Sequence, residues 1–238
     1  MEFQVLFQDE HMVAIRKPSG ILVHRTGISQ DRVYVLQMLR NQLGRHVYPV
    51  HRLDRGTAGI LLFALDASVA RLLQAGWESA ACVKTYLAIV RGWLPESGTI
   101  DAPLKKDGSG PPQPALTTYR CLAQAELPMP VDRYPTARYS MAEVRLHTGR
   151  MHQIRRHFAH LSHPVLGDFK RGDRHHNHAW ADKYGLSALQ LMAWRLQLVH
   201  PVTGEALAWE ASPEPAMVEA MHILGLDFFR VTHPSRRP

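Results

Sequence analysis

The sequence predicts an α+β fold in which helices flank a mixed, mainly antiparallel sheet. Three observations indicate this fold class. Short apolar runs typical of strands recur along the chain, helical spacing of apolar residues appears between them, and turn signals separate several neighbouring strands closely enough for hairpins. With 238 residues, of which 45% are hydrophobic, the chain can bury a full core, and we expect a single domain over residues 1–238.

The first 65 residues are expected to form a hairpin, a helix and two further strands. Apolar runs at 4–7 and 12–15 flank polar residues and predict the hairpin. Apolar residues at three- and four-residue steps predict a helix over 29–43, which Gly44 ends. The apolar stretches 47–50 and 60–65 are predicted strands, and the second is hydrophobic enough to be buried on both faces.

A helix and a strand are expected next. Asp66 can cap a helix, whose predicted buried face is Val69, Leu72, Leu73, Trp77 and Ala80. Residues 84–90 follow as a strand that places Tyr86 and Ala88 on one face. The Pro- and Gly-rich residues 95–114 predict a loop, and the prolines within 127–139 predict a second surface excursion.

The remaining chain contains one strand, one hairpin and two helices by the same criteria. Alternation over 142–146 predicts a strand with one solvated face. A helix capped by Thr148 should follow, with a core stripe of Met151, Ile154, Phe158 and Leu161. The His-rich residues 174–178 are expected in a loop. Residues 196–205 predict a hairpin, and 213–224 a final helix closed by Gly225.

The charge of the chain favours a polyanionic partner such as nucleic acid. The formal net charge is +7, and 22 Arg stand against 6 Lys. Arginine suits planar, bidentate and stacking contacts, which phosphate and RNA recognition use. A basic surface without a nucleic-acid partner is the alternative, and charge alone does not exclude it.

Cysteine usage and hydropathy indicate a cytoplasmic protein without a membrane anchor. The two cysteines, Cys82 and Cys121, lie far apart in the sequence, which fits a reduced compartment better than a disulfide framework. The first residues lack the pattern of a signal peptide, and no apolar run approaches the length of a membrane span. We expect a soluble monomer.

The loop of residues 51–59, HRLDRGTAG, is the strongest candidate for a catalytic site. It lies between two predicted strands, and a rigid sheet can aim the side chains of such a loop. We expect Asp54, between Arg52 and Arg55, to be the catalytic carboxylate. The alternative is an ordinary surface ion pair, which is the commoner role of an Asp between two arginines.

Arg155 and Tyr86 are the predicted partners of Asp54. On the predicted helix Arg155 lies one residue from Ile154, at the edge of the core stripe, so its guanidinium needs a carboxylate partner. Asp54 is a plausible one, and a guanidinium favours its ionised form. The alternative role of Arg155 is phosphate binding with Arg150 and Arg156. Tyr86 is either an ordinary core tyrosine or a ring that stacks on an extruded base.

The fifteen histidines suggest a metal site only weakly. His175, His176 and His178 with Asp182 are a possible ligand set, but adjacent histidines rarely converge on one ion. No HExxH or paired CxxC pattern supports zinc. We therefore expect no metal, and we interpret the His-rich stretch as facing RNA.

Six sequence blocks together resemble the pseudouridine synthases of the RluA family. They are KPSGILVH at 17–24, HRLDRGTAG at 51–59, KTYLA at 84–88, TGRMHQIR at 148–155, PVLGD at 164–168 and HPVTG at 200–204. The blocks occur in the family's order. The chain departs from the broader family at Met192, where many members have histidine, which argues against a catalytic role for that position.

The resemblance implies that the protein isomerises uridine to pseudouridine in RNA, with Asp54 as the essential aspartate and without a cofactor. The stretch 174–191 and the expected lack of an added N-terminal RNA-binding module resemble members that act on uridine 65 in the T-arm of tRNA. The residues expected to contact RNA are Arg52, Arg55, Lys84, Arg150, Arg156 and His152. Three alternatives remain: the same chemistry on ribosomal RNA, a catalytically silent RNA-binding protein, and a zinc hydrolase.

Overall fold

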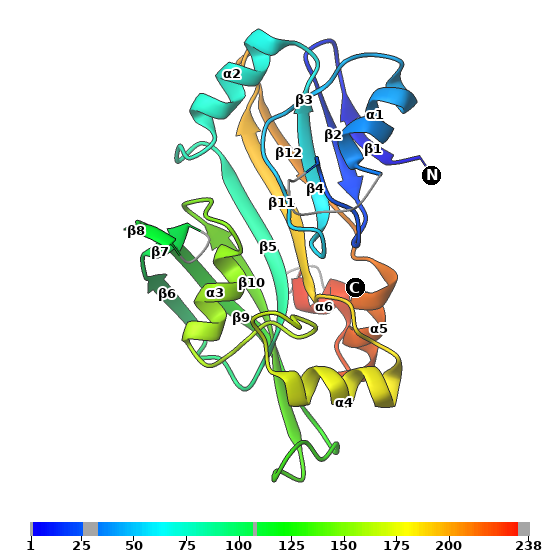
Figure 1. Cartoon of the computed structure of the whole chain (residues 1–238), viewed down its shortest axis with the longest axis vertical. Helices are drawn as coiled ribbons and strands as arrows, with labels where there is room; N and C mark the ends of the chain where they lie inside the picture. Colours follow the sequence, from blue (N-terminus) through cyan, green and yellow to red (C-terminus); the bar gives the residue numbers. More distant parts are fainter. Residues whose placement is uncertain (1, 26–32, 107–108, 233–238) are drawn as a thin grey trace. The chain divides into compact units, whose positions relative to one another are not determined.

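The computed structural model describes residues 2–25, 33–106 and 109–232 (Figure 1). By its internal contacts the chain divides into two compact units. Unit 1 comprises Met1–Lys84 and Met192–Ser212, and unit 2 comprises Thr85–Leu191 and Pro213–Pro238. The expectation of a single domain over 1–238 stays a prediction.

Unit 1 is built around one fully buried strand. Its strands are β1 (Gln4–Gln8), β2 (Met12–Lys17), β3 (Tyr48–Pro49), β4 (Ala58–Ala64), β11 (Leu191–Val199, which begins one residue inside unit 2) and β12 (Ala206–Glu210). The strand order is β1-β2-β4-β11-β12, with β3 paired to β4. Every residue of β4 is buried, which confirms the prediction from its unbroken apolar run. β11 runs parallel to β4, whereas β1, β3 and β12 each pair antiparallel with their neighbours.

In the helices of unit 1 the predicted capping residues are correct, whereas the predicted buried faces are only partly correct. They are α1 (Val35–Leu43) and α2 (Ala67–Gly76). The carboxylate of Asp66 accepts the backbone N–H of Ser68 at 2.7 Å, as expected for a capping residue. Gly44 ends α1 in the left-handed conformation, as predicted.

The boundaries of both helices correct the prediction. α1 begins at Val35, Val33 is 57% exposed, and residues 29–32 lie outside the described chain. α2 ends at Gly76, so Ala80 lies beyond the helix and is exposed, and Leu72 is 53% exposed. The buried face of α2 is therefore narrower than the apolar spacing indicates.

Unit 2 contains a second set of strands. They are β5 (Val83–Arg91, whose first two residues belong to unit 1), β6 (Ser97–Asp101), β7 (Leu104–Lys106), β8 (Ser109–Gln113), β9 (Leu116–Leu127) and β10 (Ala137–Leu146). The order is β5-β10-β9-β6, and β7 pairs with β8. β9 is antiparallel to both β10 and β6. With the parallel pairing of β4 and β11 in unit 1, these pairings confirm the predicted mixed, mainly antiparallel sheet.

The loop predicted over 95–114 is wrong, because β6, β7 and β8 occupy most of it. β6 is stabilised by pairing with β9, a long strand that the sequence reasoning did not assign. The prolines of β8, Pro111 and Pro112, fit a strand that pairs with β7 alone, where a missing N–H is tolerated. The predicted excursion at 127–139 shortens, because β10 begins at Ala137.

The helices of unit 2 are α3 (Gln153–His160), α4 (Arg174–Tyr184), α5 (Pro215–Ile223) and α6 (Phe228–Thr232). The predicted cap of α3 is wrong. The Thr148 hydroxyl donates to Gln153 Oε1 at 2.9 Å instead, and His152 precedes the helix in the left-handed conformation. Ile154 and Phe158 are buried as predicted, in one cluster with Ala88 of β5.

Two other predicted elements have opposite outcomes. The His-rich stretch 174–178 is helical rather than a loop, because the Asp173 carboxylate accepts the N–H of His176 at 3.1 Å and starts α4. The predicted hairpin at 196–205 is confirmed in outline, since β11 and β12 pair antiparallel around residues 200–205. The helix predicted over 213–224 is α5, which ends just before Gly225 as expected, but it is not the last helix because α6 follows it.

Candidate active site

Asp54 lies on residues 51–59, which we call the Asp54 loop; this segment follows β3 of unit 1 and includes the first two residues of β4 (Figure 1). The residue is partly buried, and its carbonyl accepts the N–H of Thr57 at 3.1 Å in a tight turn. Gly59 then brings the chain onto β11: a Cβ there would lie 2.1 Å from the carbonyl oxygen of Ala193. With φ at +109°, this position requires glycine. The buried strand β4 thus fixes where the loop ends.

A buried lysine holds the Asp54 loop from beneath. Lys17 is fully buried, and its Nζ donates to the carbonyl oxygens of Pro18 at 2.9 Å, Arg55 at 3.2 Å and Thr57 at 2.8 Å. A buried ammonium is stable only when hydrogen bonds replace its lost water, and these carbonyls supply them. The ammonium therefore fixes the backbone of residues 55–57, which directly follow Asp54.

The turn after Lys17 adds further bonds to the same loop. Ser19 Oγ donates to the Gly56 carbonyl at 2.8 Å, and the N–H of Gly20 donates to the Arg55 carbonyl at 2.8 Å. Arg55 Nε donates in return to the Gly20 carbonyl at 3.0 Å. The Pro and Gly of this segment predict a turn, but its hydrogen bonds to the Asp54 loop were not predicted from the sequence.

A second network fixes the start of the Asp54 loop. His51 Nε2 accepts the N–H of Leu62 at 3.1 Å, and its ring stacks on Trp77 with centroids 4.2 Å apart. Lys84 Nζ donates to the carbonyl of Trp77 and lies 5.4 Å from the centroid of that ring. Burial, and then the charge of Lys84, lower the pKa of His51 to about 3. His51 is therefore a neutral acceptor at neutral pH.

In unit 2, Arg155 is a buried cation with a carboxylate partner. Its side chain is 8% exposed, and Nε and Nη2 donate to the two Asp168 oxygens at 2.6 and 2.7 Å. Burial alone would raise the pKa of Asp168, but the hydrogen bonds and charge of Arg155, with the N–H groups of Arg171 and Lys170, lower it below its ordinary value. The expectation that Arg155 needs a carboxylate is correct, and Asp168 is a partner that the sequence analysis missed.

Tyr86 lies on β5 and is partly buried against the hydrophobic cluster that contains Ile154 and Phe158 of α3. The structure thus brings Tyr86 and the helix of Arg155 to one core. Asp54 belongs to unit 1 and both of these residues to unit 2. The expected meeting of Asp54 with Arg155 and Tyr86 therefore stays a prediction.

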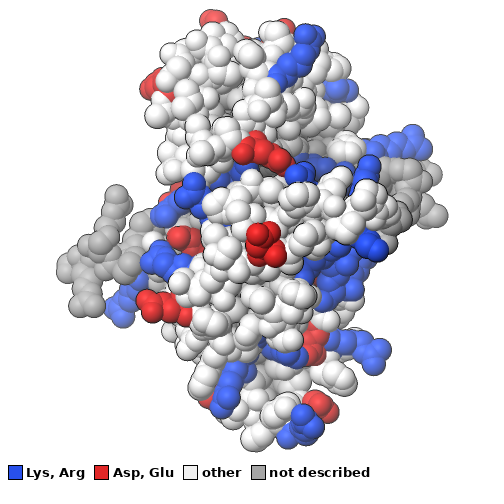
Figure 2. Space-filling view, turned by 90° about the vertical axis from the view of Figure 1, so that its left-hand side faces the viewer, with Lys and Arg blue, Asp and Glu red and all other residues white. Residues whose placement is uncertain are grey.

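The residues expected to contact RNA differ in exposure. Arg52 and Arg55 are exposed, and burial together with the charge of Arg52 lowers the pKa of His24. Lys84 is only 7% exposed, with its ammonium bound to Trp77. RNA binding by these residues stays a prediction. On the face drawn in Figure 2, Lys and Arg side chains are widely exposed among smaller areas of Asp and Glu.

Three further expected RNA contacts lie at α3. Arg150 Nε donates to the Pro114 carbonyl at 3.2 Å, and Arg156 Nη1 donates to the Lys105 carbonyl at 2.9 Å. His152 Nδ1 accepts from Arg171 Nε at 3.2 Å. These bonds hold the side chains in defined positions around the start of the helix, and RNA binding by them also stays a prediction.

The candidate metal ligands do not form a site in the described part of the chain. Within residues 2–25, 33–106 and 109–232, no three His, Cys, Asp or Glu side chains are grouped as a metal would require.

Among those residues, too, none of the helices is long and apolar enough to cross a membrane.

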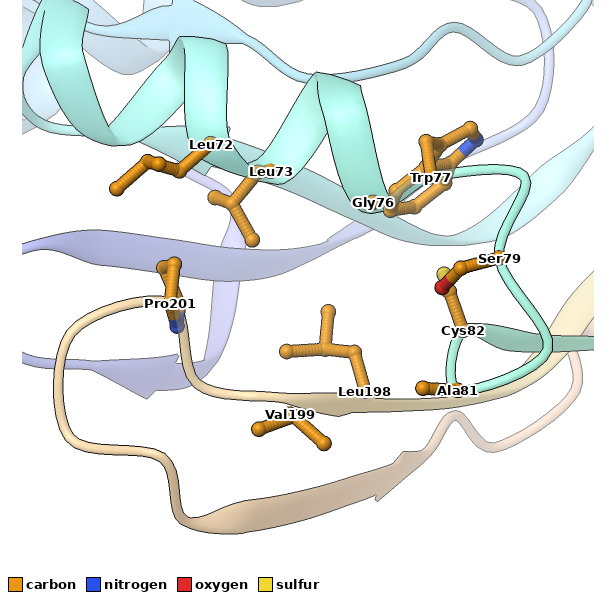
Figure 3. Close-up of a pocket in the computed structure, with 10 residues that line it drawn as sticks. All are labelled: Leu72, Leu73, Gly76, Trp77, Ser79, Ala81, Cys82, Leu198, Val199 and Pro201. Carbon is orange, nitrogen blue, oxygen red and sulfur yellow. The ribbon is translucent and has the colours of Figure 1, made fainter.

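A hollow in unit 1 lies between α2 and β11 (Figure 3). Its lining is mainly apolar and includes Leu73, Trp77 and Leu198. Burial raises the pKa of its one thiol, Cys82, which keeps that group protonated and weakly nucleophilic. The lining offers no carboxylate or imidazole, so the chemistry expected of Asp54 does not take place there.

A family model described as RNA pseudouridylate synthase matches residues 11–160, which include the Asp54 loop, Tyr86 and Arg155. The chain belongs to this family. The prediction of a pseudouridine synthase, an isomerase of the RluA type, is therefore confirmed.

Similar proteins agree with this assignment. The tRNA pseudouridine synthase C of Pectobacterium carotovorum subsp. carotovorum is 47% identical over 219 residues, which are 87% of this chain and 58% of the relative. That of Pasteurella multocida (strain Pm70) is 43% identical, over 95% of this chain and 98% of the relative. The chain thus spans somewhat more than half of the first relative and nearly all of the second.

A solved human structure shares the fold. Human RNA Pseudouridylate Synthase Domain Containing 4 superposes with a TM-score of 0.72 at 25% identity, covering 94% of each chain. The fold class predicted from the sequence is thereby confirmed from a second direction.

Proposed function

We propose that the protein converts uridine 65 in the T-arm of tRNA to pseudouridine, with Asp54 as the essential residue. The observation that carries the proposal is the fixed Asp54 loop: a partly buried carboxylate whose backbone is held by Lys17 and by Gly59. Relatives covered over most of their length carry the name tRNA pseudouridine synthase C, which supports tRNA as the substrate.

The reaction breaks the bond from C1′ to N1 of uridine and forms one from C1′ to C5. The base turns between the two steps, C5 loses its proton and N1 gains one. No electron is gained or lost overall and no group is imported, so the reaction needs no redox cofactor. Asp54 either attacks C1′ or removes the C2′ proton, and both routes require its ionised carboxylate with lone pairs available.

The roles proposed for the other residues follow from their chemistry. Arg155 orients Asp54 and favours its ionised form, and its buried pair with Asp168 supports this role because the pair fixes the guanidinium plane. Tyr86 stacks on the target base and moves the C5 proton. Arg52, exposed at the loop, fills the space that the flipped nucleotide leaves in the RNA.

The target nucleotide must leave its stack before Asp54 can reach the sugar, at a cost of a few kcal/mol. Phosphate contacts from Arg52, Arg55, Arg150 and Arg156, with stacking on Tyr86, offset that cost. Lys84 and His152 complete the proposed RNA contacts. The proposal also includes a cytoplasmic location, which suits a tRNA substrate, and a monomeric enzyme.

Tritium release from tRNA labelled at C5 of uridine tests the proposal directly. Asp54→Ala is expected to abolish release while tRNA binding stays within about twofold, because the carboxylate serves the chemistry and not the docking. Arg155→Ala is expected to lower kcat by at least about 100-fold, since a misplaced catalytic group loses about this much. Turnover above background in the Asp54 variant would remove that residue from the mechanism.

Asp66→Ala is the matched control, because it also deletes one carboxylate from unit 1. It should cost about 1 kcal/mol of stability through the lost helix cap and leave turnover unchanged. Ribosomal RNA fragments, assayed in parallel, separate the proposed substrate from the alternative one. Release from ribosomal fragments alone would refute the tRNA assignment and retain the chemistry.

A further inference from the structure

The turn that leads into α4, residues 168–172, presents an aromatic ring between basic side chains. We call it the Asp168 turn. Phe169 is 51% exposed, although large apolar side chains are usually buried, and the next two residues, Lys170 and Arg171, are exposed as well. The rings of Phe169 and of His178 on α4 are nearly perpendicular, with an interplanar angle of 80° and centroids 5.8 Å apart, so this contact covers at most one face of the Phe169 ring.

The Asp168 turn is held rigid from inside. Asp168 Oδ1 accepts the backbone N–H groups of Lys170 and Arg171, each at 3.1 Å, and the Asp168 carbonyl accepts the N–H of Gly172 at 2.8 Å. Asn177 Nδ2 donates to the same carbonyl at 3.0 Å. A Cβ at Gly172 would lie 2.4 Å from that carbonyl oxygen, so the turn closes on itself. A turn that is already rigid loses less conformational entropy when it binds a ligand.

The local charge is positive because nearby carboxylates are already paired. Asp168 is bound by Arg155, and Asp173 is bound by Arg91. Lys170, Arg171 and the exposed Arg174 therefore dominate the outward-facing charge of this segment.

A hydrogen bond joins the Asp168 turn to the start of α3: Arg171 Nε donates to Nδ1 of His152, the residue before the helix, at 3.2 Å. His152 is one of the residues expected to contact RNA.

We propose that the Asp168 turn is an RNA-docking element, in which Phe169 stacks on an unstacked base and Lys170 and Arg171 bind the flanking phosphates. An aromatic face beside cations is how proteins hold single-stranded nucleotides, since every base has a π face and every linkage a charge. The inference rests on the proposed function for the identity of the RNA. It adds a specific surface, outside the predicted contacts, that positions the substrate.

Binding to an unmodified tRNA transcript tests the proposal, with the full-length protein and heparin as a second polyanion. Phe169→Ala is expected to weaken tRNA binding about 5- to 150-fold, the range for one lost stacking contact, and to leave heparin binding unchanged because heparin has no bases. Phe169→Trp should restore tRNA binding. Phe229→Ala is the matched control, since Phe229 is 73% exposed in the same unit.

The basic residues have a different signature. Lys170→Ala should weaken binding to both polyanions, and the slope of log Kd against log salt should fall by about 0.7 to 0.9 for its lost phosphate contact. Unchanged tRNA affinity in Phe169→Ala, or equal losses in Phe169→Ala and Phe229→Ala, would overturn the proposal. Equal weakening of tRNA and heparin binding by Phe169→Ala would also overturn it. That result would mean that the segment recognises the negative charge of its ligand and not a base.

The test remains informative whatever the fate of the proposed function. If wild-type protein binds the transcript but makes no pseudouridine in it, the proposed function fails while the docking experiment still yields its answer. If activity is present, turnover at saturating enzyme should be the same in Phe169→Ala and in wild type. A fall in that saturated rate with unchanged affinity would mean that the ring acts in the chemistry and not in docking, which would also refute the proposal.

Discussion

Each unit buries a cation that serves the predicted site: Lys17 in unit 1 and Arg155, itself a predicted site residue, in unit 2. Their hydrogen-bond partners described above differ in kind. In unit 1, Lys17 donates to backbone carbonyls of its own turn and of the Asp54 loop. In unit 2, Arg155 forms a two-pronged pair with the carboxylate of Asp168. The first arrangement fixes a backbone, and the second fixes the plane of a side chain.

This difference matches what each unit is proposed to provide. The Asp54 loop must place a carboxylate for the substrate, and the bonds of the Lys17 ammonium to the carbonyls of Arg55 and Thr57 fix the backbone that carries it. Arg155 must present its guanidinium in one orientation, which a bidentate carboxylate defines better than a point contact does. The two devices should therefore fail in different ways when altered.

The largest loss of stability is expected from a feature that both units share, a glycine packed against a backbone carbonyl. A Cβ at Gly59 would lie 2.1 Å from Ala193 O, and one at Gly167 would lie 2.0 Å from Ala188 O, both at positive φ. Alanine at either position should cost more than about 4 kcal/mol, because backbone must move in a packed core. Gly44→Ala, with open space around it, should cost about 1 kcal/mol by chemical denaturation. Similar costs for Gly44→Ala and Gly59→Ala would show that the close approach is relaxed easily.

The next largest effect should separate the units. Asp168→Asn removes the carboxylate charge that pairs with the buried Arg155 and should cost about 3 to 5 kcal/mol. Because the folded-state pKa of Asp168 is lowered, its contribution is present above the ordinary value near 4 and is lost as pH falls through the folded value. The difference between wild type and Asp168→Asn should therefore shrink below about pH 4.

Lys17→Met supplies the comparison for that experiment. It leaves buried carbonyls without a donor and should cost about 2 to 3 kcal/mol. Carbonyl oxygens do not titrate, so this cost should be the same at about pH 6 and about pH 3. A parallel decline of both differences with acid would mean that the two cations are not held in different ways.

Local sequence patterns predicted single elements better than they predicted the contacts between elements. The apolar run of β4 and the Asp66 cap depend on local patterns, and both were predicted correctly. The strands β6 and β9 depend on pairing with each other, which no local pattern reveals, and the prolines of β8 are tolerated only because of its pairing. Long-range pairing thus accounts for the errors over residues 95–127.

The same distinction applies to the side chains of the site. Burial of Arg155 followed from its helical position, and it is 7% exposed. Its partner Asp168 lies in a turn between helices, at a position that periodicity does not address. Lys17 is the last residue of β2, and its ammonium donates to the carbonyl of Arg55, 38 residues further along the chain. No spacing rule predicts this contact.

The smallest effect expected between about pH 7 and about pH 5 concerns the neutral imidazole of His51, which lies near a second cation of unit 1, Lys84. Because the pKa of His51 is about 3 in the fold and near 6.5 in the unfolded chain, only the unfolded chain takes up a proton between these values. Stability should therefore fall as pH drops below 6.5, by up to about 1.4 kcal/mol per pH unit from this group.

His51→Gln keeps an acceptor for the Leu62 N–H but does not titrate. This variant should be less stable than wild type at neutral pH, because stacking on Trp77 is weakened, and the gap should narrow as pH falls from about 7 to about 5. Other histidines with lowered pKa values, among them His157 and His176, titrate in both proteins and cancel in the difference. A gap that stays constant would mean that His51 gains its proton in the fold as readily as in the unfolded chain. The Asp54 loop would then begin at a charged imidazole beside Lys84, which the bond from the Leu62 N–H to Nε2 does not permit.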